Sequence, residues 1–212
     1  MIFRAVLLAI SYGFAVNAAP DASTPRAAVT SLWRAVLDED AHALHQALFT
    51  ANDVERELAS AMADLLVAGE RLKRAARERY GDAGDAIGRR MIDADDAAAL
   101  ERAVVVEKGD FATVTIEGAQ RPLTFRRTDQ GWKLIVTGPE GGRPQATAEQ
   151  TALIAASARA VNEAAEEISN GRHASVQAAS KAIEAKLHAV MLKAHSKGAA
   201  TQPAAATRPV EP

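Results

Sequence analysis

The stretch "AVVVEKGDFATVTIEGAQRPLTFRRTDQGWKLIVT", residues 103–137, decides the fold class of this chain. It contains four segments rich in β-branched and aromatic residues, separated by "KGD", "GAQ" and "DQG", which are typical of turns. Apolar and polar side chains alternate along three of the four segments. The pattern predicts an antiparallel meander with one apolar face.

Helical sequence precedes the predicted sheet. Thr24 can cap a helix whose first residue is Pro25, because the fixed φ of proline suits the first helical position. Apolar residues at helical spacing predict a short helix over residues 41–49 and a long helix over residues 52–80. Asn52, with a glutamate three residues later, resembles a capping box at the start of the long helix. We expect no strand between these two helices.

Two further helices follow the predicted sheet. Alanine-rich sequence predicts them at about residues 147–169 and 174–195, and Gly171 between them can adopt positive φ in a turn. Their narrow apolar stripes must pack either on the helix over residues 52–80 or on a second subunit. The predicted fold class is α+β: N-terminal helices packed on a curved antiparallel sheet of about four strands, followed by a C-terminal helical hairpin.

The compositions of the two ends of the chain indicate segments outside the folded domain. Residues 1–18 have the layout of a secretory signal peptide, with Arg4, an apolar run, and small residues before a cleavage site after Ala18. The apolar run is about 12 residues long, shorter than the ~18 to 20 that span a bilayer. We therefore expect export to a periplasmic or extracellular location, without a stable membrane anchor. Residues 197–212 have prolines and no apolar period, which predicts a disordered tail.

Composition limits how this chain can be stabilised and what it can bind. None of its 212 residues is cysteine, so neither disulfides nor a lipid-modified cysteine are possible. Without the signal peptide, 24 basic residues stand against 27 acidic ones, a balance that argues against nucleic acid as a partner. Alanine occurs 49 times, and because its methyl group buries little area, the core must be built from few large side chains.

The order of these elements resembles the nuclear transport factor two-like superfamily, which includes ketosteroid isomerases and polyketide cyclases. The similar motifs are "AVTSLWRAVLDED" at residues 28–40, "GDFATV" at 109–114 and "GWKLIV" at 131–136. The resemblance covers residues 24–138 and implies a cone-shaped fold whose N-terminal helix lies in the concavity of a curved sheet. It also implies that association through the sheet is possible, and many small exported bacterial members have no known activity. The long helix over residues 52–80 departs from the family, where this helix is often shorter.

The predicted chain therefore has five parts. They are a signal peptide (1–18), an α+β cone-like domain (24–138), a linker (139–146), a helical hairpin (147–196) and a disordered tail (197–212). Because the hairpin lies outside the resemblance, the resemblance implies nothing about how it packs.

The family's enzymes use a cavity between helix and sheet, with a carboxylate base and a phenol or protonated acid as oxyanion donor. In this chain Trp33, Phe125 and Trp132 could line an apolar pocket there, and Arg127 could hold an anion at its mouth. The alternative is that the aromatic residues are the core of a lean domain and that Arg127 extends to water. We expect the core arrangement, since Tyr80 is the only phenol of the mature chain and lies at a helix end.

No motif in the sequence predicts a catalytic residue, a metal site or a cofactor. His42 and His45 share a helical face, as metal-ligand pairs do, but no third ligand is indicated. Phosphate-binding loops, nucleophile elbows and cysteine nucleophiles are missing from the sequence.

The sequence therefore predicts an exported, non-enzymatic protein of the cell envelope that acts in binding or assembly. Its partner would be an unknown protein, or a second copy bound through the sheet or the C-terminal hairpin. Two alternatives stay open. One is a small-molecule binder or isomerase-like enzyme that uses the apolar pocket, and the other is a periplasmic helical chaperone with a small sheet attached.

Overall fold

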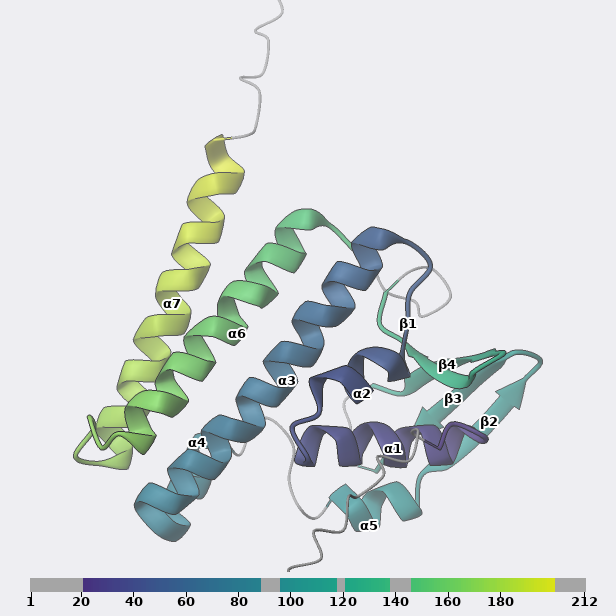
Figure 1. Cartoon of the computed structure of the whole chain (residues 1–212), viewed down its shortest axis with the longest axis horizontal. Coiled ribbons are helices and arrows are strands. Elements are labelled where there is room, and N and C mark those ends of the chain that lie inside the picture. Colours follow the sequence, from purple (N-terminus) through teal and green to yellow (C-terminus); the bar gives the residue numbers. More distant parts are fainter. Residues whose placement is uncertain (1–20, 89–95, 118–120, 138–145, 201–212) are drawn as a thin grey trace, which may run out of the picture.

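The chain has the α+β fold class that its sequence predicts (Figure 1). The computed structural model describes residues 21–88, 96–117, 121–137 and 146–200. Its elements in chain order are α1 (Pro25–Leu37), α2 (Ala41–Ala47), β1 (Leu48–Phe49), α3 (Asp53–Tyr80), the 3₁₀ turn η1 (Gly81–Gly84), α4 (Asp85–Gly88), α5 (Asp96–Glu101), β2 (Val104–Lys108), β3 (Phe111–Thr115), β4 (Leu123–Thr128), β5 (Gly131–Ile135), α6 (Ala148–Ser169) and α7 (Val176–Ala200).

The sheet contains the predicted meander and one additional strand. Strands β2 to β5 pair antiparallel in sequence order, and the order across the five-stranded sheet is β1-β5-β4-β3-β2. Strand β1 joins the outer side of β5 in parallel, with Leu48 opposite Leu134 and Phe49 opposite Ile135. The sheet is therefore mixed, and β1 and β2 are its edge strands.

The expectation that no strand lies before the long helix was wrong, because residues 48–49 form β1 and the sheet therefore has five strands, one more than the four of the meander. Helix α2 ends at Ala47, and Leu48 has extended backbone angles that direct the chain along β5. A strand of two residues is too short to show the twofold alternation by which strands are recognised in a sequence. Its pairing with β5 depends on a segment far away in the chain.

Helix α1 covers one face of the sheet. As predicted, the Thr24 side chain accepts a hydrogen bond from the N–H of Ala27, and Pro25 begins the helix. Val29 of α1 is buried in the same apolar cluster as the inward side chains of the sheet. Trp33 is partly buried against this cluster.

Helix α3 is the central element of the molecule and contributes to three apolar clusters. Asn52 caps it, and the Glu55 carboxylate accepts a hydrogen bond from the N–H of Ala51 in a variant of the predicted capping box. One side of α3 packs on the sheet layer through Ala59, and another packs on α6 through Ala68. Because alanine has a short side chain, the two helices can approach closely, which gives the alanine-rich composition a structural role.

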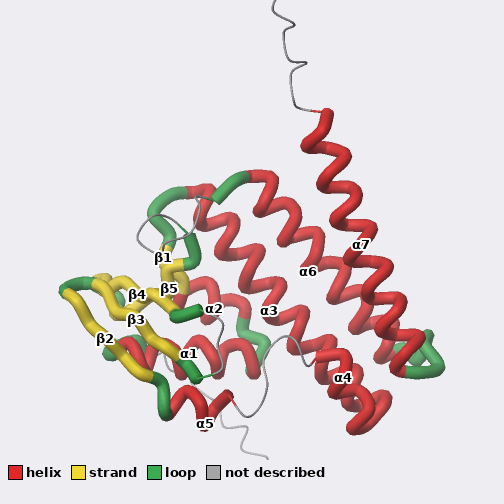
Figure 2. The backbone as a smooth tube through the Cα atoms, turned by 180° about the vertical axis from the view of Figure 1, so that it is seen from behind, coloured by secondary structure: helices red, strands yellow, loops and turns green. Residues whose placement is uncertain are grey.

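The C-terminal hairpin packs on α3 of the same chain (Figure 2). Helix α6 runs along α3, and α7 lies on the far side of α6. Gly171 between them has φ 69°, as expected for its position after a helix. Helix α7 continues to Ala200, so residues 197–200 are helical and not part of a disordered tail as predicted, because alanine near the end favours helix.

Several predicted segments lie outside the described residues. These are the signal peptide over residues 1–18, most of the linker over residues 139–146, and residues 201–212 of the tail. Within the part of the chain that the structure describes, no helix has both the length and the apolar character needed to cross a bilayer.

Candidate functional site

The aromatic side chains predicted to line a pocket meet in the core of the sheet layer. Phe125 and Trp132 have exposed fractions of 1% and 2%, and both belong to one apolar cluster with Val114. Trp33 of α1 packs against the same cluster. The twelve buried members of this cluster are all apolar, so the face of the sheet beneath α1 is filled by packed side chains.

Arg127, the fourth predicted pocket residue, lies at the end of β4 and reaches the surface. Its guanidinium carbon is 4.7 Å from the ring centroid of Trp132, its partner in the sheet register. One guanidinium nitrogen is 3.3 Å from Oε2 of Glu107, and the side chain is 52% exposed. Arg127 therefore stacks on the outer side of the buried tryptophan and pairs with a carboxylate on β2.

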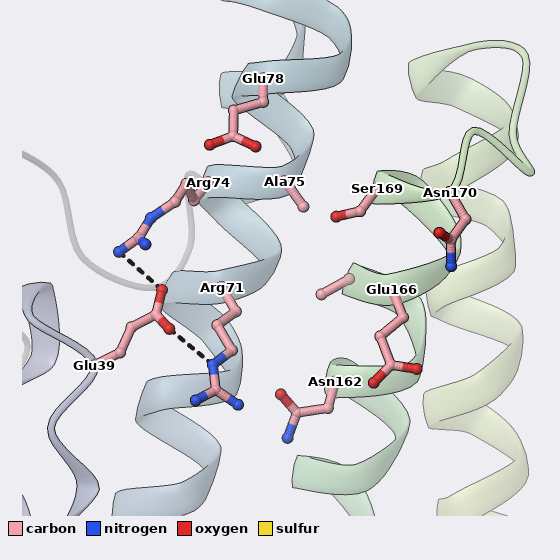
Figure 3. A pocket seen from close by; sticks show the side chains of 10 residues that line it. Glu39, Arg71, Arg74, Ala75, Glu78, Asn162, Glu166, Ser169 and Asn170 are labelled. Atoms are coloured by element: carbon pink, nitrogen blue, oxygen red, sulfur yellow. Dashed lines mark hydrogen bonds and ion pairs between the residues drawn. The ribbon is translucent and has the colours of Figure 1, made fainter.

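A charged groove of about 520 Å³ lies elsewhere, between α3 and α6 (Figure 3). Figure 3 shows that it spans the face of α3 between the turn after α1, which carries Glu39, and helix α6. Its lining consists of Glu39, Arg71, Arg74, Ala75, Glu78, Asn162, Ala165, Glu166, Ser169 and Asn170.

Glu39 positions one wall of this groove through an uncommon backbone conformation. It follows α1 with φ 55°, and the N–H groups of Glu39 and Asp40 donate to the carbonyls of Val36 and Ala35. This is the hydrogen-bond pattern of a Schellman motif, in which the left-handed residue is usually glycine because other residues are strained there. A glutamate at this position indicates that its side chain has a separate role.

The Glu39 carboxylate lies between two arginines of α3. Its Oε2 accepts a hydrogen bond from Nε of Arg71 at 2.7 Å, and its Oε1 is 2.8 Å from a terminal nitrogen of Arg74. The second contact is an ion pair without hydrogen-bond alignment, so Oε1 is buried without a hydrogen bond. The carboxylate thereby ties the corner between α1 and α2 to the middle of α3.

The groove is lined by two arginines and three carboxylates, the latter being Glu39, Glu78 and Glu166. Arg71 and Arg74 come from α3, while Glu166 and Asn162 come from α6, and Figure 3 shows Arg71 and Asn162 facing each other. Guanidinium groups donate to carboxylates and phosphates, and carboxylates accept from amines. The groove is therefore suited to a polar partner that carries both charges.

A second cluster of charges links α6 and α7 beside this groove. Lys186 is 3.2 Å from an Oε1 of Glu167, and His173 Nε2 is 3.4 Å from Oε2 of the same carboxylate. Burial acts to raise the pKa of Glu167, but hydrogen bonds and charge attraction from Lys186 and His173 outweigh it and lower that pKa. Burial acts to lower the pKa of Lys186, but hydrogen bonds and charge attraction from Glu167 and Glu163 outweigh it and raise that pKa. These pairs join α6 to α7, and a smaller hollow of about 240 Å³ lies beside them, lined by Glu163, Glu166, Glu167, Asn170 and Arg172.

Tyr80, the phenol considered for an oxyanion site, has a structural contact instead. Its hydroxyl donates a 3.0 Å hydrogen bond to the carbonyl of His173, joining the end of α3 to the hairpin turn. His42 contacts Gln46 on its own helix at 2.8 Å. Among the described residues, no group of three or more His, Cys, Asp and Glu side chains is arranged to hold a metal ion.

Sequence reasoning did not find the groove. The sequence does contain a partial signal for the groove. Arg71 and Arg74 are three residues apart and so share one helix face, and the Glu39 carboxylate follows α1. The pairing of these segments depends on tertiary structure.

Comparisons with known proteins add no further information about the site. No family model, no curated protein and no solved structure matches this chain. The resemblance to the nuclear transport factor two-like superfamily stays a prediction, and the site is described from its geometry alone.

Proposed function

We propose that this chain is an exported, non-enzymatic protein of the cell envelope that acts in binding or assembly. The observation that carries the proposal is the filled sheet face beneath α1. Phe125 and Trp132 have almost no exposed surface, and their buried neighbours in the cluster are apolar. A catalytic cavity needs both open volume and polar groups in that volume. The packing therefore favours a protein whose activity lies on its outer surface.

The groove between α3 and α6 supplies a surface for such binding. Its arginines and carboxylates are fixed on two packed helices, so a partner would meet prearranged charges. Half-exposed side chains such as Arg71 remain accessible to a partner while Glu39 holds them in place. We propose a polar protein surface or a small molecule with both charges as the partner of this groove.

Export to the periplasm or the extracellular space is part of the proposal. It is supported by the signal-peptide layout of residues 1–18. The carbonyl of Ala22 accepts a 2.9 Å hydrogen bond from the N–H of Trp132, so the mature chain is held to the sheet from this residue onward. Cleavage after Ala18 would leave that contact intact.

Native mass spectrometry of the full-length gene product, purified from an exporting host, tests the proposal. We expect the mass of residues 19–212, with any retained partner lost in Arg71→Ser and kept in Arg56→Ser. Arg56 is the matched control because it lies on α3, is similarly exposed, and pairs with Asp53 outside the groove. An uncleaved chain would contradict export. A retained apolar molecule that disappears in Trp132→Ala would instead support the alternative, a binder or isomerase-like enzyme with its pocket between helix and sheet.

A further inference from the structure

Strand β2 is an edge strand that exposes two large apolar side chains. Val104 and Val106 each have an exposed fraction of 61%, the highest among the large hydrophobic side chains of the described residues. They point to the same face, because side chains alternate along a strand. Natural edge strands are usually protected by proline, inward charges or bulges; β2 has charges only at its hairpin end, Glu107 and Lys108, and its first three residues are valines.

The outer edge of β2 also has backbone groups available for pairing. Lys108 and Phe111 close the two-residue turn between β2 and β3, so they form a hydrogen-bonded pair of the ladder. Pairs alternate along an antiparallel ladder, so the N–H and C=O groups of Val105 and Glu107 point away from β3. In the part of the chain that the structure describes, no strand lies on that side.

We propose that β2 pairs antiparallel with β2 of a second copy of this chain, about a twofold axis through Val106. This register is the one in which all five residues of β2 pair with all five of the other copy. Val106 then faces Val106 of the second copy. Val104 faces Lys108, whose aliphatic stem covers it.

Charge complementarity favours this register over its neighbours. Two positions beyond each end of β2, Arg102 and the turn residue Asp110 of the second copy flank the paired strands with opposite charges. An axis through Glu107 would place two glutamates opposite each other, and an axis through Val105 would place Arg102 opposite Lys108. Like charges directly opposite are destabilising, so both neighbouring registers are disfavoured. Glu107 itself is paired with Arg127 of its own copy.

The proposal deepens the proposed function, on which it rests, by naming a second copy as the partner in assembly. Two five-stranded sheets would become one continuous sheet across the axis. Figures 1 and 2 show β2 and the α6–α7 hairpin at opposite ends of the molecule, so both grooves would remain open in the dimer.

Disulfide trapping tests the register directly, because the full chain has no cysteine of its own. The proposed pairing makes Val106 a non-hydrogen-bonded pair with Cα atoms about 4.5 Å apart, within the range that a disulfide spans. We expect Val106→Cys to form a covalent dimer under mild oxidation. Val104→Cys is the matched control, since it has the same exposure, face and strand. Its two copies would lie about 13 Å apart and should stay unlinked.

Charge substitution at Val106 tests the same axis without a covalent bond. In sedimentation velocity, wild type should dimerise with increasing concentration, while Val106→Glu alone and Val106→Lys alone should remain monomeric. An equimolar mixture of the two variants should recover a heterodimer, because each charge then faces its opposite. Circular dichroism of each variant checks that the fold is retained.

Three results would overturn the inference. They are a wild type that stays monomeric, equal cross-linking of Val104→Cys and Val106→Cys, or homodimers that persist in Val106→Glu. None of these results would contradict the proposed function. That function has a separate test, which measures signal-peptide cleavage and the loss of a retained partner in Arg71→Ser.

Discussion

Removal of the Glu39 side chain separates two opposing contributions to the stability of this fold. Glu39 has a strained backbone at φ 55°, while its carboxylate binds Arg71 and Arg74 with only 16% of the side chain exposed. Glu39→Ala removes the carboxylate and keeps most of the strain. Glu39→Gly removes the carboxylate and the strain together.

The expected magnitudes follow from these contacts. Charge-assisted contacts contribute about 1.5 to 3 kcal/mol when buried, but both arginines are half exposed, so screening reduces the pair to roughly 1 to 2 kcal/mol in total. A non-glycine residue in the left-handed region costs about 1 kcal/mol or slightly more. We therefore expect Glu39→Ala to lose about 1 to 2 kcal/mol of unfolding free energy, and Glu39→Gly to be about 1 kcal/mol more stable than Glu39→Ala.

Urea unfolding of the three proteins, followed by circular dichroism, measures both differences. A double-mutant cycle with Arg71→Ala isolates the pair, and a coupling energy of roughly 0.5 to 1 kcal/mol is expected. Equal stability of the alanine and glycine variants would refute the strain at Glu39. A Glu39→Ala protein as stable as wild type would refute any contribution from the carboxylate.

Two further predictions concern a glycine turn and a titrating pair. Gly131→Ala should lose roughly 2 to 3 kcal/mol of unfolding free energy, and Gly109→Ala only about 1 kcal/mol, as measured by thermal or urea unfolding. Both glycines have positive φ, but only at Gly131 would a Cβ also lie 2.5 Å from the carbonyl oxygen of Ala22. Equal losses would contradict this close approach. The pKa of Glu167 is lowered in the folded chain, so its stabilising effect is present above its ordinary pKa of 4.5 and is lost as the pH falls through the lower, folded value. Glu167→Gln should thus be less stable than wild type at pH 7, and the difference should vanish in strong acid; a constant difference across that range would contradict the role of Lys186.

The elements that could be predicted from the sequence are those determined by local patterns. The meander over residues 103–137 follows from twofold alternation and turn residues, and the long helix α3 from its spacing and its cap at Asn52. Thr24 and Pro25 likewise begin α1 by rules that involve only nearby residues. In each case, short-range preference and the final fold agree.

The features that could not be predicted depend on distant pairings. Strand β1 is two residues long and exists because β5 lies beside it. The contact between Glu39 and Arg71 joins segments 32 positions apart and requires the turn after α1 to fold back onto α3. Periodicity carries no information about either contact.

Of the four residues considered for a pocket, Phe125 and Trp132 are buried in the core, Trp33 is partly buried, and Arg127 reaches the surface. Side-chain alternation along β4 places Phe125 and Arg127 on one face, and Arg127, near the end of the strand, stacks over Trp132. Alternation along a strand predicts which face of the sheet a side chain lies on, but not how deeply it is buried. Burial at a strand end depends on which element covers it.

The most direct test of a filled sheet face is the unfolding free energy of Trp132→Ala. Trp132 is 2% exposed within an apolar cluster, so its truncation should leave a cavity and cost about 3 to 5 kcal/mol. A loss of that size, measured by urea unfolding, is the result that the account predicts. A loss below about 1 kcal/mol would mean that Trp132 contributes little to packing, and the space beneath α1 would then have to be regarded as a pocket.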